Sequence, residues 1–271
     1  MSSLRDLVDV WRSACDDFSA LAQKLDELEW SLPTDCPGWS VQDVVAHAAA
    51  LESEVAGDPP ADVAVDESTA HIKNDRGIYT ETGVLARRDR TPGELIAEFR
   101  DAVERRTAQL RDEPLDDPES MAPITPGGAR WSWATLLRNR PVDIWVHEQD
   151  IRRAVGRPGG VDSPGARHTQ TTFAAALPIV VAKRAQVAPG STVVVDVTGP
   201  VSALYAVTVD ADGRGAFTAA EDVEPIARLT MNSETFTILG AGRREPSRLA
   251  VKVDGDAAVA ARVMAAMAVT P

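Results

Sequence analysis

Residues 33–47 of the sequence read PTDCPGWSVQDVVAH, a turn followed by the start of a helix. The two prolines and the glycine among the first six of these residues cannot continue a helix, so any helix before them ends here. Ser40 is a good N-cap residue, with Asp43 three positions further on. The apolar residues that follow recur at helical spacing, and His47 lies on their face. This segment therefore predicts two helices joined by a turn, with an imidazole on the inward side of the second.

Helical periodicity continues on both sides of this segment. Residues 4–28 carry an apolar side chain at every third or fourth position, which predicts an amphipathic helix before the turn. Residues 72–85 show a weaker helical pattern, and Thr91 opens a further helix with a proline at its first position. Residues 131–155 predict a long helix in which Pro141 marks either a kink or a fresh start. Amphipathic helices joined by short and medium loops favour an up-down four-helix bundle.

The pattern changes after residues 156–165, GRPGGVDSPG, which are the best linker candidate in the chain. A helix is expected near residues 164–185. Short runs with the β-branched bias of strands follow at residues 192–197, 203–209, 215–218, 227–230 and 249–253. A helix follows each of the last two strands. The sequence thus predicts two domains, a helical bundle at residues 1–158 and a small α+β domain at residues 164–271.

The composition excludes several classes of function. The 271 residues include 28 Lys and Arg against 41 Asp and Glu, a net charge of −13. Nucleic acids and anionic membranes repel such a chain, so we expect neither as a partner. The longest apolar stretch, residues 173–182, is too short to cross a bilayer, and the N-terminus has no hydrophobic signal core. Two cysteines make no disulfide framework, which indicates the reducing cytoplasm, whereas the oligomeric state stays open.

Two of the four histidines lie on inward faces of predicted helices. His147 follows Asp143 by four residues, so a carboxylate and an imidazole lie side by side on one helix face. Together with His47 from the second helix, they supply two nitrogens and one oxygen. Three protein ligands with one open position are typical of a catalytic zinc site rather than a structural one. The spacing therefore suggests a metal site in the core of the bundle.

Simpler interpretations of the same residues remain open. An inward histidine is often a hydrogen-bonded core residue, and an acid four residues before a histidine can form a simple surface ion pair. Asp43 stands four residues before His47 and repeats the pattern. Asp43 is either a second carboxylate that orients His47 or a charge that favours the helix N-terminus, and the spacing does not distinguish these roles.

Several stretches resemble one known family. Residues 33–47 and residues 140–151, RPVDIWVHEQDI, are similar to the signature of the mycothiol-dependent maleylpyruvate isomerase family, a branch of the DinB-like helical bundles. Residues 73–77 are also similar, and residues 227–271 resemble the sterol-carrier-protein-like C-terminal domain of that family. The resemblance covers most of the chain. It implies a DinB-like bundle followed by a sterol-carrier-protein-like α+β domain.

The resemblance also implies a site. It implies a divalent metal, usually zinc, whose ligands correspond in this sequence to His47, Asp143 and His147. The family's usual acid is glutamate, so Asp143 is one methylene shorter, although aspartate is an acceptable oxygen ligand. Arg76 is carried over as a catalytic residue that grips a substrate carboxylate, with a solvated loop charge as the alternative.

The implied chemistry is that of an activated thiol. A thiol bound to such a metal loses its proton at neutral pH. The thiolate either adds to a double bond and leaves after rotation, which is isomerisation, or stays attached, which is S-transfer. The implied cofactors are thus the divalent metal and mycothiol or a similar low-molecular-weight thiol, and the partner is a small electrophilic molecule. We favour S-transfer, because no stretch of the sequence indicates a maleylpyruvate pocket.

Other residues and one other function compete with this interpretation. Cys36 is a further candidate nucleophile because it precedes a helix N-terminus, but its neighbour Asp35 opposes ionisation. Arg228 and Arg243 are further candidates in the second domain. The alternative function is a non-enzymatic metal- or small-ligand-binding protein on the same fold. Its apolar cavity would be lined by inward tryptophans, which are more often core residues: Trp39, Trp131, Trp133 and Trp145.

Overall fold

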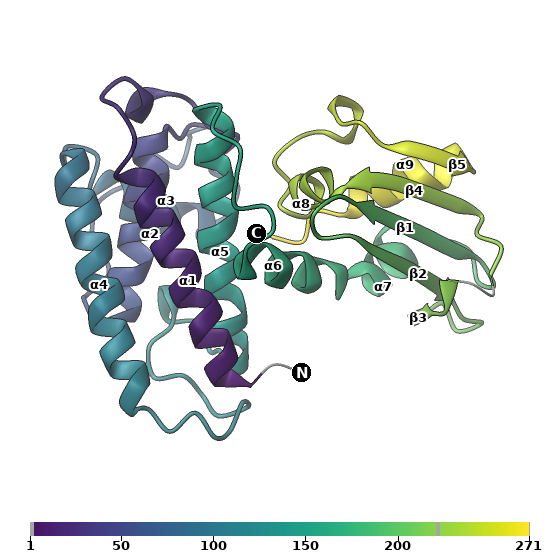
Figure 1. Cartoon of the computed structure of the whole chain (residues 1–271), viewed down its shortest axis with the longest axis horizontal. Coiled ribbons are helices and arrows are strands. Elements are labelled where there is room, and N and C mark those ends of the chain that lie inside the picture. Colours follow the sequence, from purple (N-terminus) through teal and green to yellow (C-terminus); the bar gives the residue numbers. More distant parts are fainter. Residues whose placement is uncertain (1–2, 221–222, 271) are drawn as a thin grey trace. The chain divides into compact units, whose positions relative to one another are not determined.

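The computed structural model describes residues 3–220 and 223–270 (Figure 1). The chain divides into two compact units, Met1–Gly160 and Val161–Pro271. Helices make up the first unit, and a small mixed sheet with helices makes up the second, so the predicted class of fold is confirmed. The predicted domains, residues 1–158 and 164–271, include Met1, Ser2, Glu221, Asp222 and Pro271, which lie outside the described residues.

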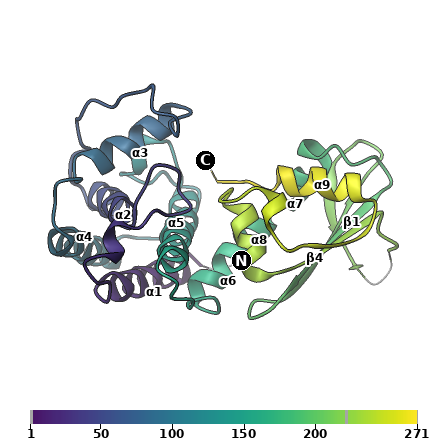
Figure 2. The ribbon, with the colours of Figure 1, turned by 90° about the horizontal axis from the view of Figure 1, so that it is seen from above.

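The first unit is built from helices that share one apolar core. They are α1 (Leu4–Ala22), α2 (Val41–Val55), α3 (Asp75–Leu85), α4 (Pro92–Asp112) and α5 (Trp133–Ala154), with the short 3-10 turns η1 (Glu29–Ser31) and η2 (Pro126–Gly128). In this unit α1 packs on α5 and α4, and α2 packs on α4, α5 and α3 (Figure 2). Their facing sides bury the core, in which the ring centroids of Phe18 and Phe99 lie 5.1 Å apart.

Capping side chains determine where α2 and α4 begin. Ser40 Oγ accepts the N–H of Asp43, and the Asp43 carboxylate accepts the N–H of Ser40. Thr91 and Glu94 form the same reciprocal pair at the start of α4, where Pro92 is the first helical residue. A capping residue of this kind stabilises its helix by roughly 1 kcal/mol. The predicted starts of both helices are therefore confirmed.

The helix predicted over residues 4–28 is too long. α1 ends at Ala22, and Leu28 is 80% exposed. The Asp26 carboxylate accepts the backbone N–H groups of Leu28 and Glu29, and such local bonds favour a turn over a helix. By contrast, α5 continues through Pro141 as one helix, so this proline does not mark a fresh start.

The second unit surrounds a five-stranded sheet. Its elements are α6 (Pro164–Ala174), α7 (Leu177–Ile179), the π-turn η3 (Val180–Arg184), β1 (Thr192–Thr198), β2 (Ala203–Val209), β3 (Gly215–Thr218), β4 (Ala227–Asn232), α8 (Ser233–Gly240), the 3-10 turn η5 (Pro246–Arg248), β5 (Lys252–Gly255) and α9 (Ala257–Ala266). The strand order is β3-β2-β1-β4-β5, in which β1 and β4 are parallel and the other neighbours are antiparallel.

Two predictions in this unit need correction. The helix expected near residues 164–185 is interrupted after Ala174, and the chain continues through α7 and η3. Pro178 has no N–H to donate to the carbonyl of Ala174, four residues earlier, so the α-helix cannot continue there. The last strand begins at Lys252 rather than at residue 249.

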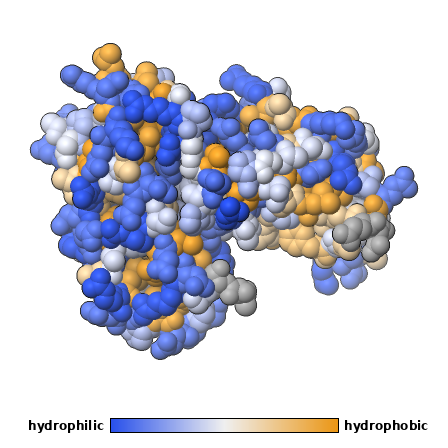
Figure 3. All heavy atoms as spheres, viewed as in Figure 1, coloured by the Kyte–Doolittle hydropathy of each residue, from blue (hydrophilic) through white to orange (hydrophobic). Residues whose placement is uncertain are grey.

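One face of the molecule shows how polar side chains are distributed on it. On the face shown in Figure 3, hydrophilic side chains cover most of the helical unit. Charged residues form 25% of the chain, and such side chains are rarely buried unless they are paired. Among the residues that the structure describes, no helix is both long enough and apolar enough to span a membrane.

Candidate metal centre

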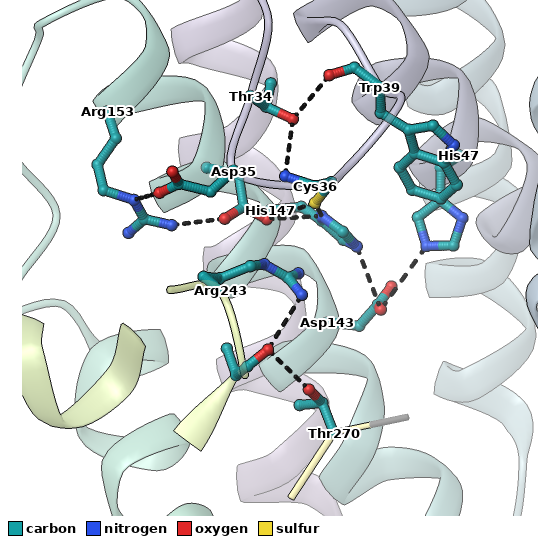
Figure 4. Close-up of polar contacts among 12 residues, drawn as sticks. Thr34, Asp35, Cys36, Trp39, His47, Asp143, His147, Arg153, Arg243 and Thr270 are labelled. Carbon is teal, nitrogen blue, oxygen red and sulfur yellow. Dashed lines mark hydrogen bonds and ion pairs between the residues drawn. The ribbon is translucent and has the colours of Figure 1, made fainter. Parts of the chain in front are cut away.

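The three ligands predicted from the sequence come together in the helical unit. α2 carries His47 midway along its length, and α5 carries Asp143 and His147 one turn apart on the same face. Because α2 and α5 pack against each other, the three side chains meet inside the unit. Figure 4 shows both imidazoles directed toward the Asp143 carboxylate.

A single carboxylate oxygen faces both imidazoles. His47 Nε2 lies 3.8 Å from Asp143 Oδ1, and His147 Nε2 lies 3.7 Å from the same oxygen. Both distances exceed a hydrogen bond, whose N···O distance is about 2.7–3.2 Å. The ligand atoms of a tetrahedral zinc ion, with bonds of about 2.0–2.1 Å, are separated by about 3.4 Å. The three donor atoms, which lie within 4.8 Å of one another, therefore suit a shared ion better than direct bonds.

The donor atoms are buried on the imidazole side and accessible on the carboxylate side. The side chains of His47 and His147 are 5% and 7% exposed, whereas that of Asp143 is 28% exposed. The ring of Trp39 covers the imidazoles, with its centroid 4.9 Å from that of His47 and 6.2 Å from that of His147. Asp143 is thus the most exposed of the three side chains, and a catalytic zinc site needs one side that an outside ligand can approach.

A buried arginine determines which oxygen of Asp143 faces the histidines. Arg140 lies one turn earlier on α5, and its Nη1 donates to Asp143 Oδ2 over 3.0 Å. The same guanidinium donates from Nε and Nη2 to Glu52 Oε1, over 3.0 and 2.6 Å. Glu52 is fully buried on α2 and also accepts the indole N–H of Trp11. Oδ2 of Asp143 is thus engaged, and Oδ1 is left for the histidines.

The electrostatic surroundings of the two histidines differ. Burial lowers the pKa of His47, so this imidazole is neutral at pH 7. Burial also opposes a charge on His147, but its hydrogen bond with Asp150 and the charge of Asp143 raise its pKa to about 10. Burial likewise opposes ionisation of Asp143, yet the charge of Arg140 outweighs it and holds the pKa of Asp143 well below its usual range. A metal at Nε2 of His147 would therefore replace a proton.

Comparisons with known proteins identify the family of this chain. A family model described as the mycothiol maleylpyruvate isomerase N-terminal domain matches residues 11–152, more than half of the chain. The matched span contains all three donor residues, His47, Asp143 and His147. This chain belongs to the mycothiol-dependent maleylpyruvate isomerase family. The resemblance seen in the sequence is thereby confirmed.

Two solved structures are similar to this member of the maleylpyruvate isomerase family. A mycothiol-dependent maleylpyruvate isomerase aligns with a TM-score of 0.60, and a histidine-to-alanine mutant described under the same name aligns with 0.58. Each alignment covers 94% of this chain and 96% of the other, at 16% sequence identity. At this identity the likeness shows a shared fold. The comparison with curated proteins finds no match.

The structure distinguishes between the two roles open to Asp43 in this family member. Its carboxylate accepts from Ser40 and pairs with Arg88, whose Nε lies 3.2 Å from Oδ1. Nδ1 of His47 is buried and has no hydrogen-bond partner among the described residues. Asp43 therefore caps α2 and does not orient His47.

Arg76 and Cys36 lie in different surroundings. Arg76 is exposed in the first turn of α3, and within the described residues it forms no hydrogen bond or ion pair, so no polar contact joins it to the donor residues. Cys36 is buried, with Sγ 3.2 Å from Asp150 Oδ2. Its neighbour Asp35 pairs with Arg153, whose Nε lies 2.8 Å away. The prediction for Arg76 is not tested by these contacts.

Arg228, Arg243 and Trp145 each make a polar contact. Arg228 Nη1 lies 3.8 Å from Asp196 Oδ2 on the sheet, and Arg243 donates to a nearby backbone carbonyl. Trp145 is buried and donates its indole N–H to the carbonyl of Gly160 over 3.0 Å. A buried tryptophan with a satisfied N–H behaves as a core residue.

The helical unit contains a pocket of about 670 Å³ that no feature of the sequence predicts. Its walls include Glu54, Tyr79 and parts of the loop at residues 121–130. The Glu54 carboxylate accepts from the Tyr79 hydroxyl and from the N–H of Gly127, the latter over 2.9 Å. Glu54 stands seven residues after His47, so it shares a face of α2 with the donor residue. The loop is held by this contact between distant segments, which local patterns do not reveal.

Proposed function

We propose that this protein is a divalent-metal-dependent enzyme that uses mycothiol, or a similar low-molecular-weight thiol, to attack a small electrophilic molecule. The observation that carries the proposal is the approach of two imidazole nitrogens, from His47 and His147, to one oxygen of Asp143. Two nitrogens, one oxygen and an accessible side match the donor set of a catalytic zinc site. Membership of the maleylpyruvate isomerase family supports the thiol as the second cofactor.

The side chains of the site have distinct tasks in this proposal. His47, Asp143 and His147 would hold the metal, with zinc as the first candidate. When bound, the metal holds the thiol as a thiolate, which is the nucleophile at neutral pH. Arg140 keeps Asp143 ionised and turned toward the histidines. Trp39 covers the imidazoles and keeps bulk water from that side of the site.

Two reactions fit this site. Isomerisation returns the thiol after each turnover, whereas S-transfer consumes it. We propose S-transfer first, because nothing in the donor cluster selects one particular electrophile. Isomerisation is the second candidate, and the names of the two similar solved structures favour it.

We also propose that Arg76 binds a carboxylate of the substrate. Its guanidinium is exposed in the first turn of α3, and a planar guanidinium pairs with a carboxylate through two hydrogen bonds. Arg76→Met should raise the KM for an anionic electrophile and leave the metal content unchanged. An unchanged KM would reject this role.

We also propose which known folds the two units adopt. Helices α1, α2, α4 and α5 form a DinB-like four-helix bundle within residues 1–158, because each packs on two of the others. The second unit is a sterol-carrier-protein-like domain within residues 164–271. Alignment of both solved structures over 94% of this chain supports the same two-part arrangement of elements.

The first test is the metal content of the purified protein beside a His47→Ala variant and a His71→Ala control. His71 lies in the same unit, where its Nε2 is 3.0 Å from Glu81 Oε2, outside the donor cluster. We expect about one equivalent of zinc in the parent and in the control, and none in His47→Ala. No metal in any of the three, after reconstitution with several divalent ions, would refute the proposal.

The second test separates the candidate reactions. The zinc form is mixed with mycothiol and either monochlorobimane or maleylpyruvate, and both the free thiol and the electrophile are followed. Stoichiometric loss of thiol with bimane supports S-transfer, and turnover of maleylpyruvate with recovery of the thiol supports isomerisation. No turnover, together with saturable quenching of tryptophan fluorescence by a ligand, would make the protein a binding protein instead.

A further inference from the structure

His147 presents its two ring nitrogens to different partners. Nε2 faces Asp143 Oδ1 at 3.7 Å, in the proposed metal site. Nδ1 lies 3.1 Å from Asp150 Oδ2, which is a normal hydrogen-bond distance. Asp150 follows His147 by three residues, so the two side chains are neighbours on one face of α5. The imidazole is therefore held by a carboxylate on the side opposite the metal site.

Asp150 is itself held firmly in place. Its side chain is fully buried, and Oδ2 accepts from the Cys36 thiol over 3.2 Å as well as from His147. Its other oxygen accepts from Nη2 of Arg153, and the same guanidinium donates from Nε to Asp35 over 2.8 Å. Figure 4 includes this pairing of Arg153 with Asp35. Donors on both oxygens leave the carboxylate one orientation.

A metal on the Nδ1 side is the competing interpretation. Cys36, Asp150 and His147 Nδ1 also group three potential ligand atoms. On that side Asp150 accepts ordinary hydrogen bonds from both neighbours and is paired with Arg153, so a cation would have to displace existing donors. On the Nε2 side the distances are too long for hydrogen bonds. The geometry thus favours the metal at Nε2, with Asp150 behind the ring.

A carboxylate behind a ligand histidine has a defined effect. An imidazole binds a metal through the lone pair of one nitrogen, and the other nitrogen then carries the proton. An acceptor for that proton fixes both the tautomer and the orientation of the ring. Among the described residues, Nδ1 of His47 has no such acceptor. Of the two imidazoles, His147 is therefore the pre-oriented one.

We propose that Asp150 is a positioning residue for the metal site: it holds the Nδ1 proton of His147, so that Nε2 presents its lone pair to the ion. This inference rests on the proposed function and adds a residue that touches neither metal nor substrate. Removing the acceptor weakens zinc binding about 10–100-fold, which is the usual effect of losing such a partner.

Zinc dissociation constants of the full chain, measured by competition with a chromophoric chelator, test the proposal. Asp150→Leu removes the acceptor, and we expect it to bind zinc about 10–100-fold more weakly than the parent. Asp150→Asn keeps an oxygen acceptor without the charge, so its affinity should lie between the two. Glu148→Gln is the matched control, because Glu148 is equally buried on α5 but pairs with Arg152. The control should bind zinc as the parent does.

Two further variants separate positioning of the ring from general support of the helix. Arg153→Met removes an ion pair of Asp150 but leaves its bond to His147, so the zinc affinity should stay close to that of the parent. A structural role for Asp150 would instead make Arg153→Met as weak as Asp150→Asn. The cobalt(II) form of the parent should show visible d–d bands without a thiolate band, and Cys36→Ser should leave this spectrum unchanged.

Three results would overturn the proposal. Equal zinc affinity in the parent and in an Asp150 variant would exclude positioning while leaving the proposed function intact. A thiolate-to-cobalt absorption band that Cys36→Ser removes would place the metal at Nδ1 of His147. A parent that binds no zinc would overturn this inference and the proposed function together. If Asp150→Leu does not fold, Asp150→Asn, checked by thermal unfolding of the metal-free protein, carries the test.

Discussion

The helical unit and the sheet unit bury different kinds of polar group. Every buried acidic or basic side chain among the described residues lies in the helical unit: Asp43, His47, Glu52, Glu54, Glu81, Arg106, Arg140, His147, Glu148 and Asp150. Over the same described ranges, the polar side chains that the sheet unit buries are neutral: Thr169, Gln170, Thr192, Ser233, Thr235 and Thr237. Burying a charge costs several kcal/mol unless it is paired. The helical unit therefore needs partners for its buried charges, whereas the sheet unit needs only hydrogen bonds for neutral groups.

This difference supports the proposed position of the site in the helical unit. A buried ion pair adds little to stability, because desolvation offsets the attraction, so a cluster of them around Arg140 and His147 indicates function. The sheet unit satisfies its polar groups with neutral bonds, such as the 2.8 Å contact between the hydroxyls of Thr192 and Thr208. All six tryptophans lie in the helical unit, so their fluorescence reports that unit alone.

The largest effect is expected when a donor histidine is removed. His147→Ala takes away one of the three proposed ligands and should abolish stoichiometric zinc binding, while tryptophan fluorescence remains that of a folded unit. His168→Ala, in the sheet unit, should leave the zinc content of the protein unchanged. Stoichiometric metal in His147→Ala would move the site elsewhere and remove the contrast between the units.

The next effect compares one arginine from each unit. Arg140→Met leaves the fully buried Glu52 without its cation, so we expect the free energy of unfolding of the helical unit to fall by about 3–5 kcal/mol. Arg228→Met removes a part-exposed pair at 3.8 Å and should cost about 0–1 kcal/mol. Urea unfolding followed by tryptophan fluorescence measures the first variant, and scanning calorimetry measures the second. Equal losses would mean that burial of charge does not distinguish the units.

Raising the pH of the metal-free protein should lower its free energy of unfolding by a few kcal/mol. The pKa of His147 is about 10 in the folded protein, against about 6.5 in an unfolded chain. Its contribution to the free energy of unfolding is therefore complete below pH 6.5 and is lost as the pH rises toward 10. His47 has a lowered pKa, so it destabilises the fold only on the acid side of its ordinary range.

Urea unfolding at a series of pH values, followed by tryptophan fluorescence, measures this loss. The alkaline loss should be smaller in His147→Gln and in the zinc-saturated parent, where the proton on Nε2 is absent. Parallel curves for the parent and His147→Gln would contradict the assignment of the raised pKa to His147.

The grouping of His47, Asp143 and His147 could be predicted because it depends on helix geometry. A four-residue step places Asp143 and His147 on one face, and His47 lies on the apolar face of its own helix, so both faces turn toward the core. Arg140 and Asp150 stand three residues from these donors, and the same rule could have identified them as neighbours. Their other contacts could not be predicted, because Glu52 lies 88 residues from Arg140, and Cys36 lies 114 residues from Asp150.

The fold shows the same division between local and distant causes. The Ser40 and Thr91 caps and the β-branched strand runs are local signals, and the elements they predict are present. The prediction extended the first helix beyond its observed end, because apolar spacing carries no information about the hydrogen bonds of the Asp26 side chain. The pocket beside Glu54 depends on a loop that binds α2 through Gly127. Gly127 lies 73 residues from Glu54 in the sequence, so local patterns do not predict this contact.

The smallest effect is expected from lengthening the proposed carboxylate ligand. Asp143→Glu adds one methylene to a side chain that is 28% exposed, and glutamate is an equally acceptable zinc ligand. We expect stoichiometric zinc, with an affinity that falls by less than the roughly 10-fold loss caused by removing an outer hydrogen-bond partner. Metal analysis and chelator competition measure both quantities. A longer side chain cannot keep both the 3.0 Å bond from Arg140 to Oδ2 and the original position of its other oxygen. A folded but metal-free Asp143→Glu would therefore show that this bond from Arg140 determines how far the carboxylate can extend toward the metal.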